Sequence, residues 1–83
     1  MTVRLKTVCP EQLGRLPDGE YEVPEGSTAL EALRACMAAA EFPPLPEAQL
    51  AKLVYMRNSR HVKPDEPLAA GDRLMVLRPL TGG

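Results

Sequence analysis

One stretch of this 83-residue sequence, from Thr28 to about Glu41, has the pattern of a long helix. Thr28 and Glu31 form a capping box, in which each side chain satisfies a backbone N–H at the start of a helix. Apolar residues follow at helical spacing: Leu30, Leu33, Met37 and Ala40. The helix ends before Pro43, because proline cannot donate the next helical hydrogen bond. A single helix covers one face of a sheet, so the other face is expected to meet solvent.

Short segments with alternating apolar and polar residues predict the strands of that sheet. In residues 2–8, the apolar Val3 and Leu5 face one way and the basic residues beside them face the other. Strands are also expected at residues 20–23, 53–57, 60–63 and 73–78, with one short turn of helix at 47–52. A loop separates the first two strands, which favours an antiparallel pair. The sequence thus predicts an α+β fold, with a mixed sheet of four to five strands packed on one main helix.

The last predicted strand is unusual because it is apolar on both faces. Leu74 and Val76 point to one side of the strand. Met75 and Leu77 point to the other side. A strand in a one-sided sheet should be polar on its outer face, and an exposed apolar patch usually marks a docking surface. We expect such a surface here; the alternative is that residues 41–52 fold over this face.

Composition excludes several classes of function. The chain has the length of one small domain. Its 10 basic and 11 acidic residues are spread along the sequence, so the basic block of a nucleic-acid-binding protein is missing. No apolar run approaches the roughly 20 residues of a membrane span. The first residues alternate and lack the apolar stretch of a signal peptide, so a cytoplasmic location is expected.

The cysteines and the histidine give no sign of a metal or catalytic site. Cys9, Cys36 and His61 are too few and too scattered to ligate a metal. Cys36 lies among apolar helix residues and is predicted to be a small buried residue, whereas Cys9 precedes Pro10 as an inert residue at a strand end. No nucleophile–base pair or paired acids are evident. We therefore expect neither an enzyme nor a chain that binds a cofactor itself.

The sequence ends in Gly82-Gly83. Glycine makes up roughly 7% of average sequence, so this pair arises by chance about once in 200 chains. A backbone carboxylate that is to be activated must enter another protein's active site, and glycine has no Cβ to clash with a narrow channel. Pro79 would stiffen the chain where it leaves the last strand. Residues 79–83 are thus expected to form a flexible carrier tail.

These features together resemble the ubiquitin-like β-grasp sulfur carriers of the MoaD and ThiS family. The resemblance lies in residues 24–28 (Pro-Glu-Gly-Ser-Thr), in the segment 68–72 that ends in Ala-Gly-Asp, and in the tail 79–83. It implies a β-grasp domain over residues 1–78. It also implies that an ATP-dependent adenylyltransferase of the MoeB or ThiF type activates the carboxylate of Gly83. Sulfur then replaces the adenylate to give a thiocarboxylate.

The resemblance also assigns roles to particular residues. The residues that would thread the partner's active site are Pro79, Leu80, Thr81 and Gly82. The residues that would form the partner-binding surface are Met75, Leu77, His61 and Lys6. Many MoaD proteins are apolar where this chain has Lys6 and His61. Family members often carry Asn-Gly where this chain has Asn58-Ser59, so a different turn type is expected here.

The pathway that receives the sulfur is less sharply indicated. Length and the proline-containing residues 41–52 favour a likeness to MoaD, the small subunit of molybdopterin synthase, with a large subunit of the MoaE type as acceptor. One alternative is a ThiS-like carrier that supplies thiazole synthase in thiamine formation. Another is a different sulfur-transfer or protein-modifier role. An alternative of another class is a β-grasp interaction module with an idle tail.

Overall fold

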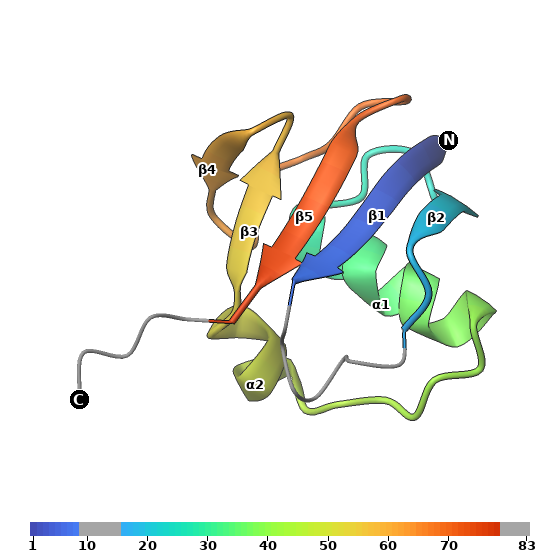
Figure 1. The fold of residues 1–83 in the computed structure, drawn as a ribbon, viewed down its shortest axis with the longest axis vertical. Coiled ribbons are helices and arrows are strands. Elements are labelled where there is room, and N and C mark those ends of the chain that lie inside the picture. The colour runs from blue at the N-terminus through green and yellow to red at the C-terminus, as the bar shows by residue number, and fades with distance from the viewer. Residues whose placement is uncertain (9–15, 79–83) are drawn as a thin grey trace.

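The computed structural model describes residues 1–8 and 16–78 of the chain. The elements in chain order are β1 (Thr2–Val8), β2 (Gly19–Glu22), α1 (Ala29–Ala39), α2 (Glu47–Ala51), β3 (Val54–Arg57), β4 (Arg60–Val62) and β5 (Arg73–Leu77). The strands form one sheet in the order β2-β1-β5-β3-β4. The central strands β1 and β5 run parallel and the other pairs are antiparallel. Figure 1 shows α1 lying across one face of this sheet, which is the expected β-grasp arrangement.

Helix α1 begins at the predicted capping box. Glu31 donates its backbone N–H to Thr28 Oγ1 at 3.2 Å, and Thr28 donates its own to Glu31 Oε1 at 2.9 Å. The helix ends at Ala39, before the prolines are reached. Glu41 takes a φ of +56°, and the N–H of Phe42 bonds to the carbonyl of Met37 at 2.8 Å. A left-handed residue with this bond is a Schellman ending, so the prolines are not what stops the helix.

The core lies between α1 and the inner face of the sheet. Its largest fully buried side chains include Tyr55, Leu5, Leu33, Leu50 and Leu74. The Tyr55 hydroxyl donates to the carbonyl of Leu50 at 2.8 Å, which satisfies the one polar atom of that side chain and joins β3 to α2. Burial of the tyrosine is therefore compatible with its hydroxyl.

Residues 41–52 pack on the helix side of the molecule. Leu50 of α2 is buried, and Phe42 and Leu45 pack against the same core. Together with Arg34 and Met37 of α1, these residues line a shallow groove. The alternative that this segment folds over the outer face of the sheet is therefore wrong.

Cys36 is the buried apolar residue that the sequence predicted. It is fully inaccessible, and burial raises the pKa of its thiol to about 12. A thiol with so high a pKa holds almost no thiolate at neutral pH and is unreactive. Cys9 lies outside the described residues. Within the described ranges, no helix has the length and apolar character needed to cross a bilayer.

The β3–β4 hairpin corrects the expectation about its turn. Asn58 and Ser59 have φ values of +51° and +70°, and positive φ at both central residues is the signature of a type I′ turn. The asparagine amide holds this conformation: Oδ1 accepts from the N–H of Arg73 at 2.9 Å, and Nδ2 donates to Asp72 at 3.0 Å. Ser59 adopts the left-handed region without such bonds of its own among the described residues.

Replacing Ser59 with glycine should therefore stabilise the domain by about 0.5–1 kcal/mol, because glycine occupies positive φ without a steric cost. Urea unfolding followed by circular dichroism measures the change. The matched control is Asn58→Gly, which also relieves positive φ but removes both amide hydrogen bonds, and it should destabilise the domain. Equal effects of the two variants would show that turn conformation, and not the Asn58 amide, governs the hairpin.

Candidate partner-binding face

The register of the sheet places four residues in one row on the outer face, and three of them were predicted to bind a partner. Lys6 of β1 pairs with Met75 of β5, Met75 pairs with Met56 of β3, and Met56 pairs with His61 of β4. Paired residues on adjacent strands point to the same side. Because the neighbouring Leu74 is buried in the core that the sheet shares with α1, this row points away from the helix. Three residues of the predicted binding surface, Lys6, Met75 and His61, thus lie in one row, with Met56 between Met75 and His61.

A second row continues the face toward the end of β5. Leu77 pairs with Val8 of β1 and with Val54 of β3, and all three are half-buried. With Met56 and Met75 of the first row they form a continuous surface, which we name the apolar patch: Val8, Val54, Met56, Met75 and Leu77. The sequence prediction included two of these five residues. Val8, Val54 and Met56 were missed, although the alternation of Val54 and Met56 with the buried Tyr55 was visible in the sequence.

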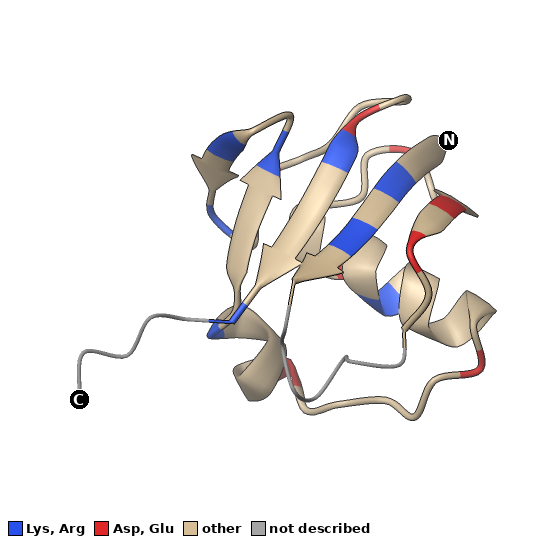
Figure 2. Cartoon of the chain, in the orientation of Figure 1, with Lys and Arg blue, Asp and Glu red and all other residues tan. Residues whose placement is uncertain are grey.

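The other end of the same face is basic. Arg4 of β1 pairs with Arg73 of β5, and both are exposed. Arg4 also reaches Glu20 of β2 with an N–O distance of 3.3 Å. Figure 2 shows blue bands on β1 and at the start of β5, red on β2, and tan along the rest of β5 up to a blue segment where the chain leaves that strand. The outer face therefore has an apolar half and a positively charged half.

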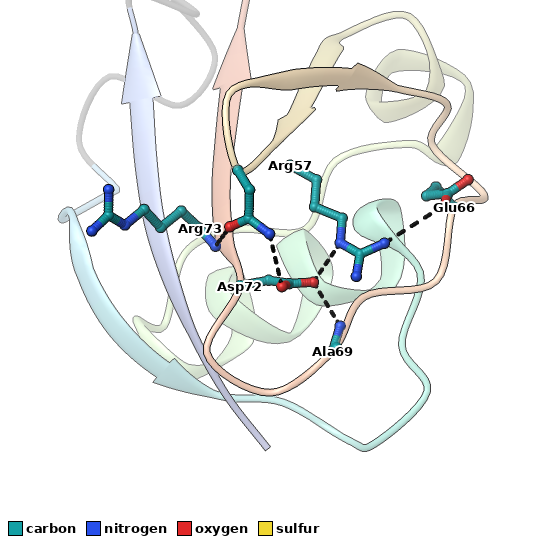
Figure 3. Close-up of polar contacts among 6 residues, drawn as sticks. Arg57, Glu66, Ala69, Asp72 and Arg73 are labelled. Atoms are coloured by element: carbon teal, nitrogen blue, oxygen red, sulfur yellow. Dashed lines mark hydrogen bonds and ion pairs between the residues drawn. The ribbon is translucent and has the colours of Figure 1, made fainter.

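A polar cluster around Asp72 fixes the start of β5 (Figure 3). The carboxylate accepts from Arg57 Nε at 2.6 Å, from Asn58 Nδ2 at 3.0 Å and from the N–H of Ala69 at 2.7 Å. Burial opposes ionisation of Asp72, but these hydrogen bonds and the Arg57 charge outweigh it and lower its pKa. Glu66 adds a longer ion pair to Arg57 at 3.7 Å. The cluster joins the loop before β5 to the β3–β4 hairpin, and so it fixes β3 and β5 relative to each other.

This polar cluster is structural and offers no catalytic group. Its carboxylate is fully occupied by donors, and Arg57 lies between two carboxylates. In the part of the chain that the structure describes, no three His, Cys, Asp or Glu residues gather closely enough to hold a metal ion. His61 is exposed on an edge strand, as expected of a surface residue. What the described residues offer is a partly exposed apolar patch on the outer face of the sheet.

The predicted carrier residues Pro79, Leu80, Thr81, Gly82 and Gly83 lie outside the described residues. The structure describes the chain as far as Arg78, directly after β5. Since Leu77 belongs to the apolar patch, the segment that follows Arg78 starts at the border of that patch. The division into a domain at 1–78 and a tail at 79–83 stays a prediction.

Residues 10–83 of the chain match the ThiS family. The match includes the helix, four of the five strands and the C-terminal residues. It covers far more than half of the sequence. The chain belongs to the ThiS family. Its members are small ubiquitin-like sulfur carriers of the MoaD/ThiS group, and the family implies an activating enzyme related to those that activate ubiquitin. No curated protein matches this ThiS-family chain in sequence.

Solved structures agree with the β-grasp architecture. SAMP1 from Haloferax volcanii is 19% identical with a TM-score of 0.67, and each chain covers 100% of the other. A second structure, small archaeal modifier protein 1 of H. volcanii, is 18% identical with a TM-score of 0.68, covering 95% of this chain and 98% of that one. A Pyrococcus furiosus protein, provisionally described as molybdopterin converting factor, subunit 1, is 25% identical with a TM-score of 0.66, covering 96% and 99%.

Replacing Leu77 with aspartate should weaken docking of this ThiS-family chain on its activating enzyme without unfolding the domain. A charge in the centre of an apolar contact costs 2 kcal/mol or more, so the dissociation constant should rise by about 30-fold or more. The matched variant is Leu74→Asp, three positions earlier on the same strand but buried with 1% exposure. That variant should unfold, because an unpaired carboxylate would enter the core. If circular dichroism finds Leu77→Asp unfolded instead, the assignment of faces is wrong.

Proposed function

We propose that this chain carries sulfur on the C-terminal carboxylate of Gly83. The observation that carries the proposal is the family match, which runs through the last residue of the sequence, Gly83. It is supported by the apolar patch, which borders the point where the chain leaves β5. A carrier needs both features, because the body must dock on an enzyme while its chain end reaches the reacting atoms.

The chemistry takes place in the activating enzyme. An oxygen of the Gly83 carboxylate attacks the α-phosphorus of ATP, and pyrophosphate leaves. A hydrosulfide-type sulfur donor then attacks the carbonyl carbon of the acyl-adenylate, and AMP leaves with its electron pair on oxygen. The product is a thiocarboxylate, a sulfur nucleophile that the carrier delivers to a second enzyme. The carrier supplies the docking face and the chain end, and the enzyme supplies the nucleotide site.

We further propose that the sulfur is used for molybdopterin, the organic part of the molybdenum cofactor. The acceptor is then a large subunit of the MoaE type, and this chain is the non-catalytic small subunit. The 25% identity to the P. furiosus protein, along nearly the full length of both chains, supports this pathway. Mixing the thiocarboxylated carrier with purified acceptor enzymes of each pathway tests it. Sulfur transfer to thiazole synthase, and none to molybdopterin synthase, would assign the chain to thiamine formation.

The proposed function is tested by incubating the purified chain with ATP, a sulfur donor and the activating enzyme from the same genome. Intact-mass spectrometry should show the mass increase of an oxygen-to-sulfur exchange, located on the C-terminal peptide. Omitting ATP should prevent the exchange. A chain whose mass stays unchanged while it still binds a partner through its outer face would be an interaction module and not a carrier.

A further inference from the structure

The outer face of the sheet is polarised along the direction of its two central strands. The row formed by Val8, Leu77 and Val54 lies at the end where β5 finishes. The Arg4–Arg73 pair lies four residues earlier on both strands, at a distance of about 13 Å. Lys6 occupies the row between them. The apolar half of the face is thus next to the end of β5, where Arg78 adds one exposed positive charge, and the Arg4–Arg73 pair is remote from that end (Figure 2).

Most of these positive charges are not neutralised within the chain. Across residues 1–8 and 16–78, no ion pair includes Lys6 or Arg73. Arg4 does pair with Glu20, but the two side chains are 61% and 64% exposed, and such surface pairs contribute little. A partner that covers this face must therefore meet the positive charges of Arg4, Lys6 and Arg73.

We propose that the activating enzyme docks on the outer face of this carrier through a surface of its own that has an apolar centre. On the side away from its ATP site, this enzyme surface carries acidic side chains. This inference rests on the proposed function. The chain end must reach ATP, so the apolar half of the carrier lies over the entrance to the nucleotide site. The basic half then contacts the enzyme about 13 Å farther away. Carboxylates at that place pair with Arg73, others nearer the centre of the face pair with Lys6, and together they fix the direction of docking.

The arrangement of charges mainly affects the orientation of the carrier on the activating enzyme and the rate at which the two proteins associate. A carrier turned by half a rotation on the same surface would place its arginines over the entrance and its tail away from ATP. Like-charge contacts or unpaired charges at the wrong end make such an arrangement unfavourable. Opposite potentials also attract the two proteins before contact, an effect that salt suppresses.

The test measures the affinity of the purified activating enzyme for the wild-type carrier and for two variants with equal change in net charge. Arg73→Glu reverses a charge on the outer face and leaves the bonds to Asn58 in place, because those bonds are made by the backbone N–H and carbonyl of Arg73. The control Arg34→Glu reverses an exposed charge on α1, on the opposite side of the sheet. In calorimetry at low salt, Arg73→Glu should raise the dissociation constant about tenfold, and Arg34→Glu should change it by less than about twofold.

A second measurement repeats the binding experiment in concentrated salt. Screening should bring wild type and Arg73→Glu close together, since the Debye length falls to about 3 Å at 1 M salt. Equal effects of the two variants at low salt, or a wild-type affinity indifferent to salt, would overturn the inference. The inference would also be overturned if Arg73→Glu weakened binding to the acceptor enzyme but not to the activating enzyme. It would likewise be overturned if sedimentation showed a wild-type dimer that Arg73→Glu or Leu77→Asp separates, because a second copy of the chain would then cover this face.

These outcomes are separable from the proposed function. The wild-type carrier is assayed in parallel for the acyl-adenylate and the thiocarboxylate by mass spectrometry. A wild-type chain that is never adenylated contradicts the carrier function itself. A wild-type chain that is adenylated normally, with Arg73→Glu and Arg34→Glu binding alike, contradicts only the acidic docking surface.

Discussion

Deletion of Gly83 should abolish thiocarboxylate formation and leave docking on the activating enzyme unchanged. The deletion shortens the chain end by one residue, which withdraws the terminal carboxylate by about 3.3–3.6 Å. Reacting atoms must approach to about 3–3.5 Å, and a misplacement of 1 Å can cost about 100-fold in rate. The terminal carboxylate of the shortened chain cannot reach the α-phosphorus of ATP from the same docked position. Mass spectrometry of the treated protein measures the loss.

The control for this deletion is the fold of the shortened chain. Every residue of the described core precedes Arg78, so the urea midpoint of the variant should equal that of the wild type. The Gly83→Ala variant keeps the length and adds one methyl group. It should retain a reduced rate if the channel is narrow. A Gly83-deleted chain that is still adenylated at the wild-type rate would be incompatible with the proposed carrier role of this residue.

Local signals in the sequence predicted the elements of the fold well. The capping box at Thr28 is made by two side chains three residues apart, and it marks the start of α1 in the structure. The alternation of Val3 and Leu5 with basic residues gave β1 its bounds and its faces. The ends of the other strands differ by no more than one residue from the predicted ranges. These features depend on neighbours in sequence, which is why they could be predicted without the structure.

Features that depend on strand order could not be predicted in the same way. The row from Lys6 to His61 requires that β5 and β3 lie between β1 and β4, and alternation alone does not give that order. The role expected for Lys6 and His61 came from the family resemblance. Met56 was missed because its place in the patch depends on its pairing with Met75, which lies on a strand distant in the sequence. The roles of all these residues in binding stay predictions.

The polar cluster was missed for the same reason. Asp72 and Asn58 are 14 residues apart, and neither residue shows in the sequence that it has the other as a partner. The prediction of a different turn type at Asn58-Ser59 was wrong because the contact between Asn58 and Asp72 was not foreseen. Serine at positive φ argued against a type I′ turn, but the hydrogen bonds of Asn58 to Asp72 and Arg73 stabilise that turn in the structure.

Replacing Asp72 with alanine should destabilise the domain by about 2–3 kcal/mol. The substitution leaves Arg57 Nε, Asn58 Nδ2 and the Ala69 N–H without their shared acceptor, in a place where the Asp72 side chain is only 9% exposed. Hydrogen bonds to charged groups contribute about 1.5–3 kcal/mol each when buried, and the partial exposure of Arg57 reduces the sum. For a domain of this size the melting temperature should fall by about 10–20 °C. Thermal unfolding followed by circular dichroism measures the shift.

Glu66→Gln provides the matched control, because Glu66 also pairs with Arg57 but at 3.7 Å and with 45% of its side chain exposed. Its effect should stay below about 1 kcal/mol. The pH dependence gives an independent check. Because folding lowers the pKa of Asp72, its ionised form contributes stability above its ordinary pKa of about 3.9, and this contribution is lost as the pH falls through the lower folded value. The difference in stability between wild type and Asp72→Ala should therefore be constant near neutral pH and shrink in strong acid. A difference that does not depend on pH would mean that the lost packing of the side chain, and not its charge, stabilises the start of β5.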